Sequence, residues 1–536
     1  SDGTVLPASV ATGLDFTFNS ISIGKGANSV SNNTVLGESA LDASVSGGNN
    51  TAVGKEALTS LTSAVSCTAV GHIAGFSHTT GNNLTAIGRG AAYTNTSGAE
   101  NTGIGAGALF YNTTGDSNTA VGRLALTANT TADHNTAMGR SALAANTTGN
   151  QNVAIGNYAL DANTTASQLT AVGYNALSNN TTGANNTALG RSALLSNVTG
   201  NHNTAVGYNA LLLSTGSSNT AIGTGALDAA TSANNNTAVG RNALGLTTTG
   251  AENTAVGQAS LDENTTGTRN TGLGDQALSS NTTASNNTAV GYQALVTNTT
   301  GIQNVAVGAN ALDANTTAGS NTAIGFNALT ANTTASQVTA LGNKTLEANT
   351  TGAGNTGLGS NALQTNTTGR DNTAGGYAAL KLNTTGIQNT AFGSEALDAN
   401  TTANSNTAVG FQALTANTTG SANTSMGNKA LDVNTEGGSN TAVGDNALGA
   451  NTTASNNTAV GKSALGANTT GTDNVGIGFQ ALDATTTGSQ NTAVGLNCLG
   501  ANTTASNNTA MGRNCMVANT TGTQNVAVGT EALENN

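Results

Sequence analysis

The sequence predicts an all-β fold, a parallel β-roll or β-solenoid of about 30 coils with 17 residues in each. The first observation is a period of seventeen: the glycine of the motif Asn-Thr-Ala-Val-Gly returns at this constant interval from Gly37 to Gly207 and again from Gly223 to Gly529. The second is that apolar residues keep fixed places relative to this glycine, and charged residues avoid those places. The third is that so short a repeat has no room for a strand, a helix and their turns. Two or three short strands joined by tight turns fit each coil instead.

One copy of the repeat, from Gly122 to Met138, defines the positions used below, with the glycine at position zero and the methionine at position sixteen. Positions three and four are usually Ala-Leu. Positions seven to ten read Asn-Thr-Thr-Gly or Asn-Thr-Thr-Ala, and positions thirteen to sixteen read Asn-Thr-Ala-Val. The remaining positions vary and carry the charges, as at Lys55 and Asp161; Glu436, in a threonine position, is an exception.

This pattern predicts the cross-section of a coil. Thr-Ala-Val suits a strand with threonine and valine on one face and alanine on the other. We expect the valine and the leucine to fill the interior, and the alanines to offer small faces where another chain approaches. Glycine and the Asn-Thr-Thr-Gly group are expected at corners, since these residues tolerate the left-handed backbone region. Successive coils then pair in parallel, about 4.8 Å apart.

The asparagines at positions seven and thirteen are expected to form ladders, in which each amide bonds to its copies in the coils above and below. Asn-x-Thr also matches the acceptor sequence for N-glycosylation. Glycans on coils about 5 Å apart would collide, and buried ladder residues cannot carry them. The structural interpretation is therefore favoured.

The chain divides into a non-repetitive segment, residues 1–18, and one continuous repeat array, residues 19–536. One residue is missing from the array in the stretch Leu211–Gly216, and we expect a turn to absorb it so that register is kept on both sides. Because Ser1 is not a start methionine and the chain stops within a repeat, we expect a longer polypeptide.

Composition excludes several classes of function. Charged residues make up 7% of the chain, the net charge is −12, and lysine and arginine form no sequence cluster of the kind that marks a nucleic-acid binder. No apolar run approaches the length that a membrane-spanning helix needs, so no membrane span is expected. Three cysteines are too few for disulfide bonds to stabilise thirty coils, and each coil has few apolar side chains to bury. Association of several chains is the simplest way to bury more apolar surface.

The segments Gly-Tyr-Asn-Ala-Leu, from Gly207, and Asn-Thr-Ala-Val-Gly resemble the head repeat of YadA-like trimeric autotransporter adhesins, and Asn19–Gly24 is the nearest match. The longer form, with Asn-Thr-Thr-Gly inserted, resembles arrays in tail-fibre proteins of bacteria and phages. The resemblance covers residues 19–536. It implies a left-handed parallel β-roll, three chains wide, in a surface-exposed fibre. The period of 17 is longer than that of the adhesin repeat, so the cross-section must differ.

The function we expect from this resemblance is that of a structural surface fibre, extracellular on a virion or on a bacterial cell. The first interpretation is a phage tail or virion fibre shaft, a homotrimer that acts as a spacer and adheres to a host-surface glycan or receptor. The alternatives are a bacterial trimeric autotransporter adhesin and a monomeric solenoid binder such as an ice-binding protein. Ice-binding faces need outward Thr-x-Thr rows, whereas Thr-Thr here lies beside turn residues. No nucleophile–base pair, P-loop or zinc spacing is present, so we expect no catalytic, cofactor or metal residues, and no enzyme.

The variable positions should form outward ridges, and any receptor contact must use them. Weak repeated contacts would gain strength through multivalency, unless specific binding belongs to a domain outside this chain. Aromatic residues recur one residue after the repeat glycine. They are candidates for stacking on sugars, although packing over a neighbouring coil or chain is the commoner explanation. These candidates are Tyr174, Tyr208, Tyr292, Phe326, Tyr377, Phe411 and Phe479.

The cysteine and histidine residues are the remaining candidates for thiol or metal sites. Cys498 and Cys515 both occupy position three in adjacent coils, where parallel Cβ vectors favour two buried thiols over a disulfide. His134 and His202 lie four coils apart, roughly 19 Å, which is too far for one metal ion. His72 and His78 share a coil, with Cys67 in the coil before. We interpret them as side chains of an irregular early repeat rather than as a metal site.

Overall fold

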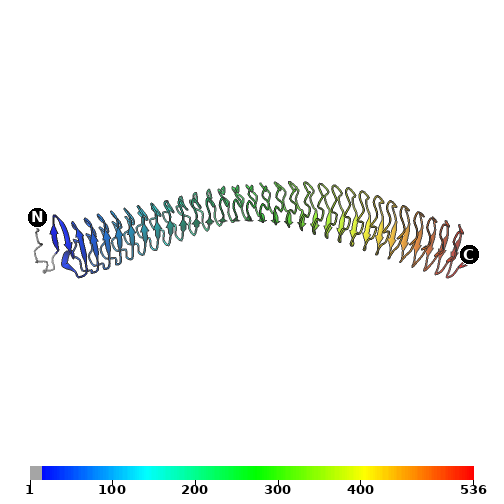
Figure 1. The fold of residues 1–536 in the computed structure, drawn as a ribbon, viewed down its shortest axis with the longest axis horizontal. Helices are drawn as coiled ribbons and strands as arrows, with labels where there is room; N and C mark the ends of the chain where they lie inside the picture. Colours follow the sequence, from blue (N-terminus) through cyan, green and yellow to red (C-terminus); the bar gives the residue numbers. More distant parts are fainter. Residues whose placement is uncertain (1–14, 536) are drawn as a thin grey trace, which may run out of the picture. The chain divides into compact units, whose positions relative to one another are not determined.

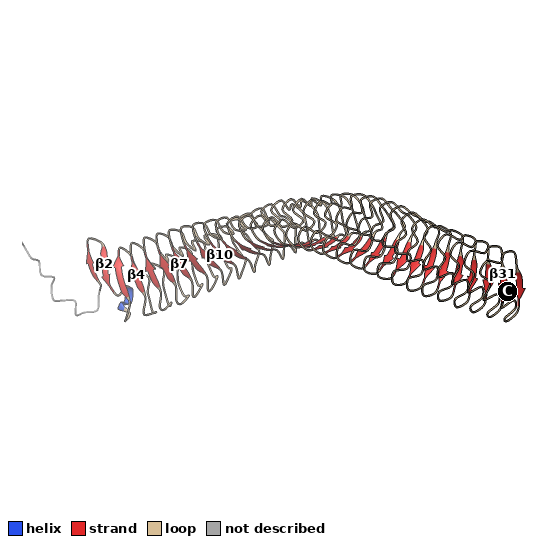
Figure 2. Cartoon of the chain, turned by 45° about the vertical axis from the view of Figure 1, so that its right-hand side comes forward, coloured by secondary structure: helices blue, strands red, loops and turns tan. Residues whose placement is uncertain are grey.

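The computed structural model describes residues 15–535 and confirms the predicted fold class. The chain is an all-β, parallel β-solenoid of about 29 turns spaced by 17 residues. It divides into two compact units, residues 1–268 and 269–536. Within each unit the strands stack one above the next (Figure 1). The one helix among the described residues is the short 3-10 helix η2 (Ala27–Ser29), blue in Figure 2.

The first unit contains an initial hairpin followed by one short strand in each coil. In chain order these strands are β1 (Phe16–Phe18), β2 (Ile21–Gly24), β3 (Thr34–Gly37), β4 (Thr51–Val53), β5 (Thr68–Val70), β6 (Thr85–Ile87), β7 (Thr102–Ile104), β8 (Thr119–Val121), β9 (Thr136–Met138), β10 (Val153–Ile155), β11 (Thr170–Val172), β12 (Thr187–Leu189), β13 (Thr204–Val206), β14 (Thr220–Ile222), β15 (Thr237–Val239) and β16 (Thr254–Val256).

The second unit continues with the same three-residue strands. They are β17 (Thr271–Leu273), β18 (Thr288–Val290), β19 (Val305–Val307), β20 (Thr322–Ile324), β21 (Thr339–Leu341), β22 (Thr356–Leu358), β23 (Thr373–Gly375), β24 (Thr390–Phe392), β25 (Thr407–Val409), β26 (Thr424–Met426), β27 (Thr441–Val443), β28 (Thr458–Val460), β29 (Val475–Ile477), β30 (Thr492–Val494), β31 (Thr509–Met511) and β32 (Val526–Val528).

Neighbouring strands in the stack pair in parallel, and each residue lies opposite its equivalent in the next coil. The pairing of β13 with β14 tests the missing residue, because it joins the two coils on either side of it. Thr204 lies opposite Thr220 and Ala205 opposite Ala221, and both alanines remain buried. The deletion falls in the turn, where Ser214 replaces the usual asparagine and Gly216 follows one residue early. The prediction that a turn absorbs it is confirmed.

The side chains that fill the interior differ from those expected. In β13, Ala205 is fully buried whereas Thr204 and Val206 are only partly buried, and the middle residue is the buried one in each of the strands β4–β32. The interior of each coil is filled by this alanine, by the Ala-Leu pair at positions three and four, and by two asparagines. The prediction that valine points inward is therefore wrong. Since side chains alternate along a strand, the buried asparagine at position thirteen places position fifteen inside and positions fourteen and sixteen outside.

The corners of the coil agree with the expectation only in part, at the repeat glycine and at the bend formed by the two threonines of Asn-Thr-Thr-Gly. Left-handed backbone conformations occur at the repeat glycine and at positions two, four and twelve. In one coil these last three are Leu124 (φ 58°), Leu126 (φ 49°) and His134 (φ 58°). The glycine of Asn-Thr-Thr-Gly does not adopt a positive φ. It is small because coils approach closely there: a Cβ on Gly115 would lie 2.3 Å from the carbonyl oxygen of Ala132. Buried leucine thus adopts a conformation that leucine rarely takes, because packing and the stack enforce it.

Both predicted asparagine ladders are confirmed. At position seven, Asn129 Nδ2 donates to Asn112 Oδ1 of the preceding coil at 2.7 Å and to the Ala132 oxygen of its own coil at 3.0 Å. At position thirteen, the backbone nitrogen of Asn118 donates to Asn101 Oδ1 at 2.9 Å, and Asn118 Nδ2 donates to the Ala132 oxygen at 2.8 Å. These side chains are fully buried, so the glycosylation sequence at position seven is inaccessible in the folded chain.

The N-terminal end of the first unit departs from the repeat. Strands β1 and β2 form an antiparallel hairpin, and β2 also lies antiparallel to β3, with Ile23 opposite Leu36. The parallel stack therefore begins at β3, although the glycine motif can be traced back to Asn19–Gly24 in the sequence. The hairpin covers the edge of β3, which would otherwise offer unpaired backbone groups. Residues 1–14 of the predicted non-repetitive segment lie outside the described residues.

Candidate functional site: the ridge after the repeat glycine

The predicted aromatic residues lie on the outside of the solenoid, as expected for variable positions. Each follows the repeat glycine at position one, and each is 46–54% exposed. Tyr174 and Tyr208 belong to the first unit, and the other five belong to the second. We call the line of position-one side chains along the coils of a unit its glycine ridge.

In the first unit an arginine links two of these tyrosines. The Arg191 guanidinium lies 5.9 Å from the ring centre of Tyr174 and 5.8 Å from that of Tyr208, within the range of cation–π attraction. Tyr158, at position two, meets Tyr174 edge to face with ring centres 6.3 Å apart, and Arg140 lies 5.4 Å from the Tyr158 ring. These five residues, all exposed except for the half-buried Tyr158, form a continuous series over successive coils, which we call the arginine–tyrosine row.

Basic residues of the first unit lie on the same ridge. Every lysine and arginine in residues 1–268 directly follows a repeat glycine, whereas those of the second unit occupy five different positions. From Gly71 to Gly257 neither position one nor position two holds an acidic residue. From Lys55 onward, stacking therefore aligns these cations along one line of a chain whose net charge is −12. Those of the first unit are Lys25, Lys55, Arg89, Arg123, Arg140, Arg191 and Arg241.

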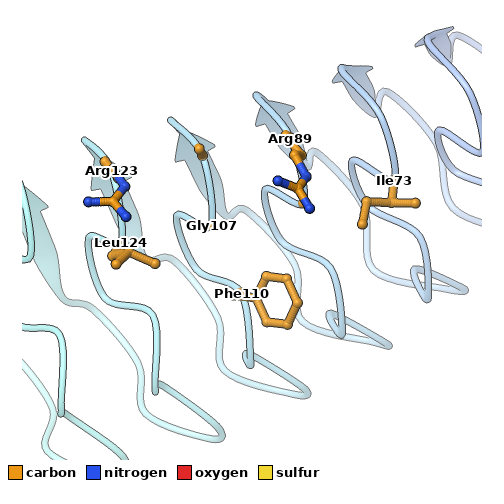
Figure 3. A pocket seen from close by; sticks show the side chains of 8 residues that line it. Ile73, Arg89, Gly107, Phe110, Arg123 and Leu124 are labelled. Atoms are coloured by element: carbon orange, nitrogen blue, oxygen red, sulfur yellow. The ribbon is translucent and has the colours of Figure 1, made fainter.

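A hollow of about 320 Å³ interrupts this ridge. It forms because three of the four residues at positions one and two of two adjacent coils carry almost no side chain: Gly90, Ala106 and Gly107. Arg89 and Arg123, both exposed, occupy position one on either side of Ala106. Figure 3 shows their side chains near the strand ends, with Phe110 lower in the coil between them. The lining residues are Ile73, Arg89, Gly90, Ala106, Gly107, Phe110, Arg123 and Leu124.

The aromatic ring in the hollow is held by a stack of its own. Phe76, Tyr93 and Phe110 occupy position five of three successive coils, with ring centres 5.2 and 4.8 Å apart and nearly parallel planes. Tyr111 meets the Phe110 ring edge to face at 4.8 Å. This column was not predicted from the aromatic residues at position one, although the 17-residue spacing of Phe76, Tyr93 and Phe110 is a direct signal of it.

The strand face is a second exposed surface. It consists of the residues at positions fourteen and sixteen of β4–β32, which alternate with the buried alanine. Position fourteen is threonine in most coils, and position sixteen is apolar in every coil except the one with Gly375. Leu189, for example, is 47% exposed and Ile324 is 36% exposed. Each unit therefore presents an apolar row beside a threonine row.

The cysteine pair is placed as the sequence indicated. Cys498 and Cys515 are free and buried, and each thiol donates to a backbone carbonyl at 3.3 Å, that of Ala510 and Ala527 respectively. Burial raises the pKa of Cys498 to about 12, so its reactive thiolate is scarce at neutral pH.

The early irregular coil separates its two histidines. His72 is exposed on the glycine ridge, whereas His78 is buried at position seven with Nε2 3.5 Å from Cys67 Sγ. His134 and His202 are exposed at position twelve of separate coils. Within residues 15–535 no three His, Cys, Asp or Glu side chains gather in a way that fits a metal ion.

No protein-family model matches the chain, and a search of curated proteins finds no match. The described part of the chain holds no helix with the length and apolar composition needed to cross a membrane.

Proposed function

We propose that this chain is the shaft of a surface fibre, built from three copies and acting as a spacer that displays the glycine ridge. The observation that carries the proposal is the strand face. In almost every coil it offers an apolar side chain that is exposed or only half-buried, a far more regular exposure than single soluble chains show.

The period of the strand face favours another copy of the same chain as its partner. A partner that covers the apolar row over many coils must repeat with the same spacing, and a copy of this chain meets that condition without adjustment. The expected contact through alanines is wrong, because Ala205 and its equivalents are fully buried. Threonine and the β-branched or longer apolar side chains of positions fourteen and sixteen would form the interface instead.

The resemblance to adhesin and tail-fibre repeats supports an extracellular fibre and a homotrimer. Within that class we favour a phage tail or virion fibre shaft, with a bacterial trimeric adhesin as the alternative. The glycine ridge would then supply any contact with a host glycan or receptor, and its aromatic residues are the candidates for such contacts.

Ice binding by a single chain remains the second candidate, since one observation favours it. Threonine side chains project from a flat run of parallel strands at equal spacing, as at Thr187 and Thr204. The neighbouring row is apolar rather than a second row of threonines. Thermal hysteresis measured on the isolated chain separates this function from that of a shaft, for which none is expected.

The native mass tests the fibre proposal. We expect three times the 52.0 kDa of one chain, and a stable monomer at micromolar concentration would overturn it. A variant with Ile155, Val172, Leu189 and Val206 all changed to lysine places four charges on successive coils of the strand face. We expect it to weaken or abolish the trimer.

A matched control puts four lysines at exposed, variable positions outside the strand face. Lysine at Gln151, Gln168, Asn185 and His202, all at position twelve of successive coils, adds four lysines there instead. The control is expected to remain trimeric. If both variants dissociate equally, net charge rather than the strand face controls assembly.

A further inference from the structure

We propose that the hollow between Arg89 and Arg123 binds an acidic sugar residue, such as a hexuronate, within an anionic polysaccharide. The site lies on a single chain of the first unit. The inference therefore goes beyond the shaft function and stands whether or not three chains assemble.

The size and lining of the hollow suit one sugar ring. A volume of about 320 Å³ lies at the small end of ligand pockets, which span about 300–1,000 Å³. Ile73, Phe110 and Leu124 supply apolar surface for the C–H face of a pyranose. The stack beneath Phe110 holds the ring in place, so little ordering is required when a ligand binds.

The two arginines are available for an anion. Among residues 15–535, neither guanidinium takes part in an ion pair or a side-chain hydrogen bond. Lys55, on the same ridge, is by contrast paired with Glu38 at 3.3 Å. A guanidinium matches a carboxylate with two parallel hydrogen bonds, which favours a carboxylated sugar over a neutral one.

The acidic residues of these coils are engaged elsewhere. Asp116 accepts a hydrogen bond from the backbone of Ala99 at 2.7 Å, and Asp133 accepts one from the backbone of Asp116, also at 2.7 Å. Glu100 accepts one from Ser117 at 3.1 Å. All three lie at positions eleven and twelve, and none lines the hollow. The positive charge of the two arginines is therefore not cancelled within the site.

The surroundings extend the site along the ridge. Arg140 follows Arg123 in the next coil and begins the arginine–tyrosine row, so cations and rings continue past the hollow in steps of about 4.8 Å. This spacing is comparable to one pyranose residue. A nucleic acid is disfavoured, because seven cations spread over the first unit are few for a phosphate backbone and the chain as a whole is acidic.

Binding of oligogalacturonate to the full chain, measured by calorimetry, tests the inference. Its methyl ester is the matched probe, since esterification removes the charge and keeps the rings. We expect the acid to bind at least about tenfold more tightly than the ester. Equal binding of the two, or tighter binding of a single-stranded oligodeoxynucleotide, overturns the proposal.

Two variants locate the site by independent means. Arg89→Gln with Arg123→Gln removes the charge, and Ala106→Tyr fills the hollow with a residue that position one accepts at Tyr174 and Tyr208. Each is expected to weaken oligogalacturonate binding about tenfold or more. Arg241→Gln, a ridge cation distant from the hollow, is the control and is expected to bind like the parent chain. Unchanged binding in either of the first two variants, with the fold intact by circular dichroism, rejects the site.

Discussion

Asn95 donates a hydrogen bond from Nδ2 to Nδ1 of His78 at 2.9 Å, the contact that a ladder asparagine makes with the asparagine of the coil before it. The other ring nitrogen of His78 lies 2.6 Å from the carbonyl oxygen of Gly81 and donates to it, as the asparagine amide does in later coils. A neutral imidazole with its proton on Nε2 thus replaces both functions of the carboxamide. The replacement works only while Nδ1 carries no proton.

Acid should therefore loosen this part of the stack. Burial lowers the pKa of His78 below its ordinary value of 6.5, so the unfolded chain takes up the proton first. The contribution of neutral His78 to the stability of the fold is fully present above pH 6.5. It is lost as pH falls through the lower pKa of the folded state. Amide exchange around Gly81 and Asn95 should quicken between neutral pH and mild acid, after correction for intrinsic exchange. His78→Asn should remove this dependence. His72→Asn, on the exposed ridge, should leave it intact.

Cutting a ladder tests how much the asparagines stabilise the coil. Asn129→Ala removes three hydrogen bonds, and leaves Asn112 Oδ1, the Ala132 carbonyl oxygen and Asn146 Nδ2 each with one partner fewer in the interior. We expect a loss of about 2–4 kcal/mol in the free energy of unfolding, from lost bonds and unsatisfied buried groups. Urea unfolding followed by circular dichroism measures it. Thr131→Ala, an exposed neighbour, should change the free energy by less than about 0.5 kcal/mol.

A half-buried aspartate at position five offers a stabilising change. Burial raises the pKa of Asp262, and the nearby Glu263 and Asp228 raise it further, with Arg241 opposing them. Because its pKa is raised in the folded state, the contribution of Asp262 to stability is fully present at low pH. It is lost as pH rises through the pKa of the folded state. Asp262→Asn should raise the melting temperature at pH 7 and change it little at pH 3. An equal rise from Glu252→Gln, an exposed change, would point to net charge instead.

Thiol labelling reports on the second unit. Cys498 and Cys515 are buried, and the pKa of Cys498 is raised to about 12, so iodoacetamide should modify neither residue in the folded chain at pH 8. Labelling should appear together with unfolding in urea. Rapid labelling of the native protein would show that these coils open or that the interior is arranged differently.

The 17-residue period was sufficient to predict most of the fold. It predicted a parallel stack, paired equivalent residues, both asparagine ladders and the place of the missing residue. It did not decide which side of the strand faces inward, and hydrophobicity suggested Val206 rather than Ala205. The position of Asn203 indicates the inward face. This ladder residue is buried, and Ala205, two residues later, must lie on the same face of the strand. The left-handed backbone conformation of leucines such as Leu211 could not be predicted from residue propensities, because the stacking of the coils imposes it.

The candidate site was only partly predictable. The exposure of Tyr208 follows from its place among variable positions, but the alignment of Arg89, Arg123 and Arg191 required sorting cations by position rather than counting them. The hollow depends on side chains that are absent, at Gly90 and Ala106. A gap of that kind has no sequence motif and becomes visible only when adjacent coils are placed in contact.

The deletion between Gly207 and Gly223 bears on how such an array can evolve. Each coil is bonded to its immediate neighbours through the same few groups, so inserting or removing a complete repeat exchanges one junction for an identical one. Unequal recombination within the gene can therefore alter the number of coils in whole steps at little structural cost. Smaller insertions and deletions should survive mainly in the turn that contains Ser214, where a lost residue leaves the strands on both sides in phase.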